Sequence, residues 1–242
     1  MIEAVNALSR GTRMVLSAGF RRYVFIPLAI NLALYIATIM LLVSRFDGWM
    51  AYWMSQVPHW LTWLEWLIWP MLVVSLILFV FFTFTLVANL IASPFYGFLA
   101  EKIERRLSDT EWSDERSLWR QGVDSLKREV QKLAYFLPRI AFLLLLGFVP
   151  AVNVFAPLLW ALFSAWSMAI QYLDYPMDNH QVSFAEMRRR LGQRWWSTLT
   201  FGGVIMAMIW IPIVNLLIMP GAVAAAVMMW QRHYVSLPAP RK

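Results

Sequence analysis

Residues 66–92 read WLIWPMLVVSLILFVFFTFTLVANLIA and contain no Asp, Glu, Lys or Arg. A membrane-spanning helix needs about 20 apolar residues to cross a hydrocarbon core of roughly 30 Å. This stretch is somewhat longer than that, so we expect a tilted span. Residues 23–44, YVFIPLAINLALYIATIMLLVS, also lack these charged residues and predict another span. The fold is therefore expected to contain two long transmembrane helices.

Two further uncharged stretches, 140–173 and 195–231, do not fit single spans. As unbroken helices they would be about 51 and 56 Å long, too long for one crossing, yet each half is too short for a full crossing. Each has a Pro-x-x-Asn pattern and a later proline near its middle: Pro150, Asn153 and Pro157, and Pro212, Asn215 and Pro220. Proline ends or kinks helices. We predict re-entrant (hemi-penetrating) helical hairpins over 140–173 and 199–231; six full crossings are the alternative.

The composition excludes most soluble classes. Hydrophobic residues make up 60% of the chain and charged residues only 14%, against roughly 25% charged residues in ordinary soluble domains. The chain has no Cys, which excludes a disulfide scaffold. An all-α integral membrane protein is the class that remains.

The basic residues predict how the chain is oriented. All Lys and Arg except Arg45 lie in four segments: 1–22, 101–139, 174–194 and 232–242. By the positive-inside rule, both termini and the 101–139 loop are expected to be cytoplasmic and 45–65 to face outward. No apolar run precedes residue 23, so no signal peptide is expected.

These observations predict a single membrane domain over 1–242. An amphipathic interfacial helix is expected in 1–22, because Val5, Leu8, Val15 and Leu16 fall on about one helical face. The remaining parts are a span over 23–44, an outer loop over 45–65, a span over 66–92, a cytoplasmic helical extension over 93–139, a hairpin over 140–173, a cytoplasmic connection over 174–198, a hairpin over 199–231 and a tail over 232–242.

Enzymatic chemistry has little support in the sequence. There is no GxxxxGK[ST], HExxH, GxSxG or glycine-rich dinucleotide motif, and the three histidines are far apart. We therefore expect no catalytic residue, no cofactor and no metal site. The net charge of +7 follows the membrane topology, so no nucleic-acid partner is expected either.

The segment Gly19-Phe20-Arg21-Arg22, directly before the first span, is the most informative local feature. Pro27 suits the first turn of a helix. A helix N-terminus offers unpaired N–H groups and partial positive charge, and two guanidinium groups beside it add further donors. Such a site suits a small tetrahedral oxyanion such as sulfate or phosphate. The alternative is that both arginines set the topology and bind lipid phosphates.

A second candidate follows the second long span. Pro94 is expected to break or kink the helix there, and Gly97 permits close approach. Glu101 is the first charge after the uncharged stretch, so it is expected near the membrane boundary, where polar groups can mark an ion pathway. An ion pair with Arg105 at i+4 is the structural alternative.

A third candidate is QYLDYPMDNH, residues 171–180. Asp174, Asp178 and His180 are close in sequence and suit proton transfer, because histidine titrates near neutrality. The structural alternative is a helix exit followed by a capping box, in which Ser183 and Glu186 begin the next helix.

Several of these segments, in this order, resemble the CysZ-type sulfate permeases of bacterial inner membranes. The motifs are GFRRYVFIPLAINL (19–32), IASPFYGFLAE (91–101), KREVQKLAYFLPR (127–139), LFSAWSMAIQYLDYPMDNHQVSFAEMR (162–188) and IPIVNLLIMPGAV (211–223). The resemblance implies sulfate uptake into the cell for cysteine biosynthesis, with proton coupling, two long membrane helices and two hemi-penetrating hairpins. It implies no cofactor.

The resemblance also implies site residues. The family's sulfate-binding arginine pair matches Arg21 and Arg22, with Gly19 and Phe20 supplying the preceding backbone. Its Gly-x-Leu-Ala-Glu motif matches Gly97 to Glu101, where Phe98 replaces the commoner leucine.

No Lys or Arg lies within 23–44, 66–100 or 140–173, so an anion path must use other groups. We expect helix ends, water and amides to line it, in a pore that subunits of a homo-oligomer share. The candidate path or gating residues are Asn31, Asn89, Gly97, Glu101, Asn153 and Asn215. Two alternatives are a channel for another small oxyanion and a structural or regulatory membrane protein that does not transport.

Overall fold

The computed structural model describes residues 1–17, 19–108, 117–209 and 211–235, although some side chains in these ranges, including those of Asn89 and Asn215, lie outside the description. The described residues form α-helices and one 3-10 helix, with no strand. The all-α class expected from the sequence is confirmed. Four of the helical segments are long and apolar enough to cross a membrane: Arg21–Ser55, Trp66–Phe84, Gly122–Gly147 and Ala156–Asn179.

The chain divides into two compact units. One comprises residues 25–92, and the other comprises 1–24 together with 93–242. Because helices α2 (Arg21–Ser55) and α3 (Glu65–Ser108) each continue past a unit boundary, each unit is described by itself.

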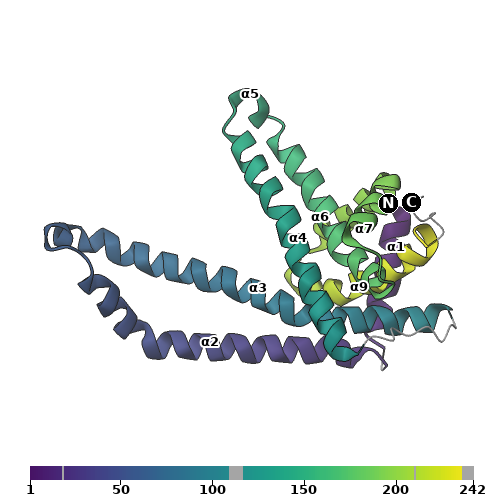
Figure 1. Ribbon diagram of the computed structural model, residues 1–242, viewed down its shortest axis with the longest axis horizontal. Coiled ribbons are helices and arrows are strands. Elements are labelled where there is room, and N and C mark those ends of the chain that lie inside the picture. The colour runs from purple at the N-terminus through teal and green to yellow at the C-terminus, as the bar shows by residue number, and fades with distance from the viewer. Residues whose placement is uncertain (18, 109–116, 210, 236–242) are drawn as a thin grey trace. The chain divides into compact units, whose positions relative to one another are not determined.

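Unit 25–92 is a pair of long helices joined by the 3-10 helix η1 (His59–Leu64) (Figure 1). Edge-to-face ring pairs link α2 to α3, with Tyr35 and Phe84 centroids 5.5 Å apart and Phe46 and Trp69 centroids 6.3 Å apart. Most other apolar side chains on both helices are exposed, as expected for surfaces that lipid covers. Both predicted spans are helical.

The two long helices extend beyond the predicted spans. At 1.5 Å per residue, the 35 residues of α2 and the 44 of α3 make helices of about 52 and 66 Å. Much of the predicted outer loop is therefore the last turns of α2. The sequence predicts a break or a kink at Pro94. A break is wrong, because α3 continues as helix to Ser108. Burial of Leu99, Ala100 and Ile103 stabilises this continuation.

The first hairpin of the other unit is formed by α4 (Leu118–Gly147) and α6 (Ala156–Asn179), with the short α5 (Pro150–Asn153) at its tip (Figure 1). The predicted proline-rich turn is therefore present. Its first arm is longer than expected, because the charged residues before 140 and the apolar residues after it form one helix. Across the hairpin, the Trp166 indole N–H donates to the Tyr135 hydroxyl at 3.2 Å.

The second hairpin joins α8 (Trp195–Ile209) to α9 (Pro212–His233), and α7 (Phe184–Gln193) connects the two hairpins. The Ser183 hydroxyl accepts a hydrogen bond from the Glu186 N–H at 3.2 Å, so the predicted N-cap of this connection is confirmed. Residues 222–227 of α9 are fully buried and form the middle of the core.

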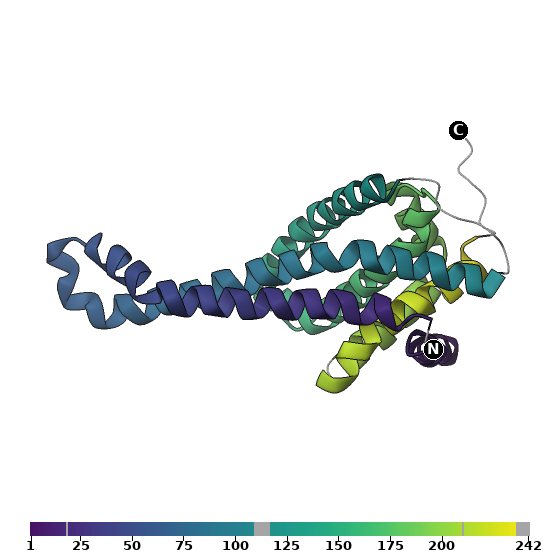
Figure 2. The same cartoon turned by 90° about the horizontal axis from the view of Figure 1, so that it is seen from below.

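Helix α1 (Ile2–Val15) packs against α9 (Figure 2). Leu8 and Val15 are buried in the shared core, whereas Val5 and Leu16 are exposed. The amphipathic helix is therefore present, but α9 covers much of the apolar face that the sequence assigned to the membrane interface. The crossing is close because Gly11 and Gly221 lie in it: a Cβ built on Gly11 would be 2.5 Å from the Gly221 carbonyl oxygen.

Candidate oxyanion site at the start of α2

Helix α2 begins at Arg21, so its free end coincides with the arginine pair. Before it, the Phe20 N–H donates to the Ser17 carbonyl at 3.1 Å, and the Tyr23 N–H donates to the Phe20 carbonyl at 3.0 Å. The expectation that Pro27 occupies the first turn is wrong, because Pro27 lies inside the helix. The first-turn N–H groups therefore lie at the two arginines, where an α-helix has no acceptor for them.

Both arginine side chains are exposed and use few of their donors. The Arg21 Nε donates to the Leu16 carbonyl at 2.7 Å, and the Arg22 Nη2 donates to the Tyr23 hydroxyl at 3.3 Å. A guanidinium group has five N–H donors, so these bonds leave donors that can reach an oxyanion. Phe20 differs from the arginines because its ring is buried in the core, which anchors the turn before the helix.

The structure adds a third cation to this site. The Nζ of Lys102, on α3, lies 5.4 Å from the ring centroid of Tyr23 and 5.9 Å from that of Phe20. The Arg22 guanidinium carbon lies 5.1 Å from the Tyr23 ring centroid. Tyr23 thus has a cation from each of two helices near its ring, and positive charge gathers beside the start of α2.

Gly97 and Glu101, the second candidate, lie on the same part of α3 as Lys102. The Gly97 carbonyl accepts a hydrogen bond from Asn179 Nδ2 at 2.9 Å, which joins α3 to the end of α6. The Glu101 carboxylate accepts a hydrogen bond from Arg105, as the structural alternative predicted. Both residues therefore have structural partners next to the candidate oxyanion site.

The four candidate asparagines belong to different parts of the chain. Asn31 belongs to unit 25–92, where its Oδ1 is buried with no hydrogen-bond partner among the described residues. Asn153 ends α5 at the exposed tip of the first hairpin. The side chains of Asn89 and Asn215 lie outside the described residues.

A buried ionic network joins α3, α4 and α6. Arg128 Nε lies 2.6 Å from Asp174 Oδ1, and Lys132 Nζ lies 3.3 Å from Asp174 Oδ2 and 2.6 Å from Glu129 Oε1. The Ser93 hydroxyl donates to the same Glu129 oxygen at 3.0 Å. Lys132 and Asp174 are each only 2% exposed. Asp174 is therefore held between two cations, which favours the structural alternative over proton transfer for this carboxylate.

His180 pairs with a residue that the sequence did not connect to it. Its Nε2 lies 2.8 Å from Glu104 Oε1, on α3. Glu104 is 6% exposed, and its Oε2 has no hydrogen-bond partner among the described residues. The His180 ring lies 5.4 Å from the Trp230 ring. The buried carboxylate and the partly exposed imidazole form the strongest candidate for proton exchange in the described part of the chain.

Helix α7 is fixed by a third group of charges. Glu186 accepts hydrogen bonds from Arg189 and Arg190, each at 2.7 Å. The bond from Arg189, and then that from Arg190, lower the pKa of Glu186 to about 2. Directly after α9, burial raises the pKa of the Tyr234 hydroxyl, which lies 2.9 Å from the Thr198 hydroxyl.

Within the described residues, no group of three or more His, Asp or Glu side chains is arranged to hold a metal ion.

Comparison with known proteins identifies the family. The model of the family described as Sulfate transporter CysZ/Etoposide-induced protein 2.4 matches residues 7–220. A Sulfate transporter CysZ from Pseudomonas syringae is 45% identical over 93% of this chain and 90% of its own length. One from Pseudomonas fluorescens strain Pf-5 is 46% identical over 99% of this chain and 98% of its own length. One from Pectobacterium atrosepticum is 42% identical over 98% of this chain and 87% of its own length. The chain therefore belongs to the Sulfate transporter CysZ/Etoposide-induced protein 2.4 family.

Proposed function

We propose that this protein is a sulfate permease that admits sulfate at the start of α2. The observation that carries the proposal is the coincidence of a helix N-terminus with Arg21 and Arg22, with Lys102 beside them. Relatives over almost the whole chain are named as sulfate transporters, which supports the same substrate.

The chemistry of the site suits a divalent tetrahedral anion. Guanidinium groups bind oxyanions through paired N–H donors, and the helix end adds roughly half a positive charge. An ammonium group such as that of Lys102 adds charge without demanding a fixed geometry. Gly19 and Phe20 hold the backbone that precedes these donors. Together the three cations offset the charge of a sulfate ion.

Beyond the entry site, we propose that polar breaks in the membrane-embedded helices line the path. The lining groups are Asn31, Asn89, Asn153 and Asn215, with Gly97 and Glu101 near its inner end. A buried Asn31 oxygen without a partner supports this for one of them. The path is completed between copies of the chain in a homo-oligomer, because two spans alone do not enclose a pore.

We place the protein in the bacterial inner membrane with both termini in the cytoplasm. The hairpins α4–α6 and α8–α9 enter the membrane and return on the cytoplasmic side. Sulfate taken up in this way supplies sulfur for cysteine biosynthesis. The transport uses no cofactor and no enzymatic step of its own.

Proton dependence of this transport is proposed to act through Glu104 and His180. The carboxylate and the imidazole lie 2.8 Å apart, and the carboxylate is buried on α3 two residues from Lys102. A proton taken up by this pair changes the charge near the entry site.

Flux of radiolabelled sulfate into proteoliposomes tests the function, and equilibrium binding of sulfate to purified protein tests the site. We expect R21A/R22A to reduce sulfate affinity about a hundredfold, from the loss of two charge-assisted contacts. The matched control R13A/R120A removes the same charge from exposed arginines elsewhere and should bind normally. Unchanged affinity in folded R21A/R22A would overturn the site. Absence of flux in the wild type would favour a structural or regulatory protein, and equal flux of phosphate would favour a general oxyanion channel.

A further inference from the structure

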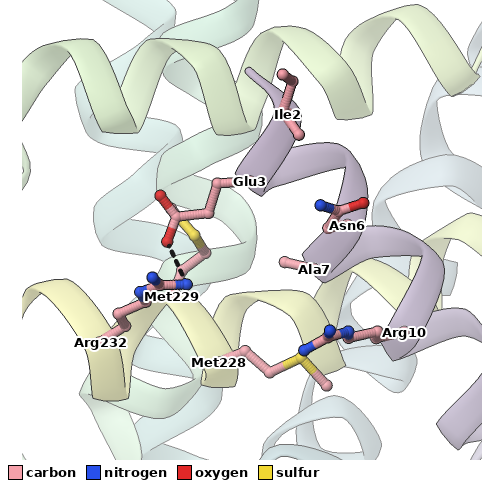
Figure 3. A pocket seen from close by; sticks show the side chains of 8 residues that line it. All are labelled: Ile2, Glu3, Asn6, Ala7, Arg10, Met228, Met229 and Arg232. Carbon is pink, nitrogen blue, oxygen red and sulfur yellow. Dashed lines mark ion pairs between the residues drawn. The ribbon is translucent and has the colours of Figure 1, made fainter.

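A groove lies along the edge of the α1–α9 crossing, and none of its lining residues belongs to the candidate oxyanion site. Its cavity measures about 390 Å³. Helix α1 lines it with Glu3, Asn6 and Arg10, and the end of α9 lines it with Met228 and Arg232 (Figure 3). We call this space the α1–α9 groove.

The charges in the α1–α9 groove do not balance. Glu3 Oε1 lies 3.0 Å from Arg232 Nη1 (Figure 3). It also lies 2.8 Å from His233 Nε2, so the one carboxylate of the groove already has two basic partners. Arg10 makes no hydrogen bond or ion pair with any described residue. Its guanidinium group therefore keeps all its donors for an outside ligand. The groove as a whole carries excess positive charge and suits an anion.

A second cavity, of about 310 Å³, shares Glu3 and Met229 with the first and continues the groove toward the start of α8. Arg194 and Trp196 line this part. The basic surface therefore extends across α1, α9 and the start of α8, and Glu3 lies between its two cavities.

Apolar and aromatic side chains border the same surface. Ile2, which lines the first cavity, is 76% exposed, and Trp196, which lines the second, is 67% exposed. The rings of Trp195 and Trp196 lie 4.0 Å apart. Exposed tryptophans beside arginines are typical of the membrane–water interface, where the ring lies among headgroups. A free inorganic anion gains nothing from these apolar groups, whereas a lipid can contact them with its glycerol and upper acyl chain.

We propose that the α1–α9 groove binds the phosphate of an anionic phospholipid headgroup. Arg10 donates to the phosphate through its unused guanidinium nitrogens, and Arg232, whose side chain is 71% exposed, donates from the opposite wall. The Asn6 amide is placed to contact the polar part of the headgroup, and Ile2 and Met228 the apolar part. This lipid site is independent of the sulfate site and of the substrate that the protein transports.

Native mass spectrometry of the full chain in detergent tests this proposal, with dioleoylphosphatidylglycerol and dioleoylphosphatidylcholine as probes. We expect the wild type to retain the anionic lipid preferentially. R10A/R232A should lower its affinity about thirtyfold, since each basic residue near an anionic headgroup contributes about a factor of five. The equal-charge control R13A/R120A should stay within about twofold of the wild type. Equal binding of the two lipids, or an equal loss in the control, would overturn the proposal.

The single variant R10Q controls for misfolding, because Arg10 makes no hydrogen bond or ion pair with a described residue that the substitution could break. R10Q should therefore fold normally and still lower the affinity for phosphatidylglycerol. R10K/R232K keeps both charges and should retain most of the wild-type affinity. Inorganic phosphate and sulfate, added in large excess, separate the two sources of anionic oxygen. If either ion displaces the lipid from the wild type but not from R10Q, the groove is a free-oxyanion site and the lipid proposal is wrong. The sulfate affinity of R10Q, measured in the same detergent, should match that of the wild type. Sulfate binding and lipid binding are thus measured separately, and failure of the sulfate proposal is distinguishable from failure of the lipid proposal.

Discussion

Glu104 Oε1 and His180 Nε2 lie 2.8 Å apart, although 76 positions separate the two residues in the chain. The second carboxylate oxygen of Glu104 is buried with no hydrogen-bond partner among the described residues. The pair joins α3 to the end of α6 beside Trp230. The charged groups nearest to it along these helices have partners of their own: Glu101 with Arg105, and Asp178 and Asp174 with Arg128. On the neighbouring α7 and α9, Arg190 pairs with Glu186 and Arg232 pairs with Glu3.

We expect E104Q to weaken the response of sulfate flux to an imposed proton gradient. Glutamine keeps the shape of the side chain but replaces its carboxyl group with an uncharged amide, so a proton can no longer be shared with His180. Flux driven by a sulfate gradient alone should remain. The measurement is sulfate uptake into proteoliposomes with and without a pH difference. E186Q, which removes a carboxylate on α7, is the control, and an unchanged proton response in E104Q would exclude this pair from the coupling.

Lys102 should contribute to sulfate binding less than the arginine pair. We expect K102A to lower sulfate affinity about fivefold, because a partly exposed ammonium group contributes about 1 kcal/mol. The loss should shrink at high salt, since screening weakens interactions between exposed charges. K127A removes an exposed lysine from α4 and should bind sulfate normally. The measurement is equilibrium binding of sulfate at two salt concentrations. Equal sulfate affinities of K102A and K127A would show that Lys102 does not belong to the site.

The sequence predicted the parts of this molecule that depend on local chemistry. The uncharged runs predicted the helices of unit 25–92, and the Pro-x-x-Asn pattern of 150–153 predicted the turn of the first hairpin. The second pattern, 212–215, lies at the start of α9, and Pro220 lies inside that helix. Where tertiary packing outweighs local preference, prediction failed. The sequence predicts a break or a kink at Pro94, yet the helix continues through it. It assigns Leu8 and Val15 to a membrane interface, yet both are buried in the core.

The contacts around the candidate site were beyond prediction for a different reason. Lys102 approaches Tyr23 only because α3 returns beside the start of α2, and no spacing within either segment shows that return. Charged residues such as Arg128 and Lys132 in a polar stretch are normally read as solvated. Their burial depends on Asp174, which is far away in the chain. Arg21 and Arg22 were easier to identify, because the helix end and both side chains are adjacent in sequence.

The ionic network around Asp174 should be essential for stability. D174N removes the charge that faces both Arg128 and Lys132. It leaves Lys132 with Glu129 alone and Arg128 with the more distant Asp178. Breaking a buried ion pair in this way costs about 3–5 kcal/mol of the free energy of unfolding. Thermal unfolding in detergent measures the loss. D47N removes the charge of an exposed aspartate on α2 and provides the control. A cost below about 1 kcal/mol for D174N would show that the network is solvated.

The hydrogen bonds to Glu186 predict how acid affects the helix α7. Arg189 and Arg190 lower its pKa from 4.5 to about 2, so the ionised form is stabilised in the folded state. This stability is fully present above the unfolded pKa and is lost as the pH falls from 4.5 toward 2. We expect the wild type to exceed E186Q in stability near neutrality and the difference to vanish at the acid end of this range. Chemical unfolding at a series of pH values tests this, and a pH-independent difference would contradict it.

The crossing of α6 and α8 provides the sharpest test of the packing. A Cβ built on Gly202 would lie 1.8 Å from the Ala165 carbonyl oxygen and 2.8 Å from its carbonyl carbon, and backbone atoms cannot yield as a flexible side chain can. At the next residue, a Cβ on Gly203 would lie 3.9 Å from the Ala165 Cβ, an ordinary contact. We expect G202A to force the helices apart and cost about 3 kcal/mol, whereas G203A should be neutral or gain up to about 1 kcal/mol of helix propensity. Thermal unfolding of both variants under one detergent condition makes the comparison, and equal stabilities would show that the two helices do not cross at Gly202.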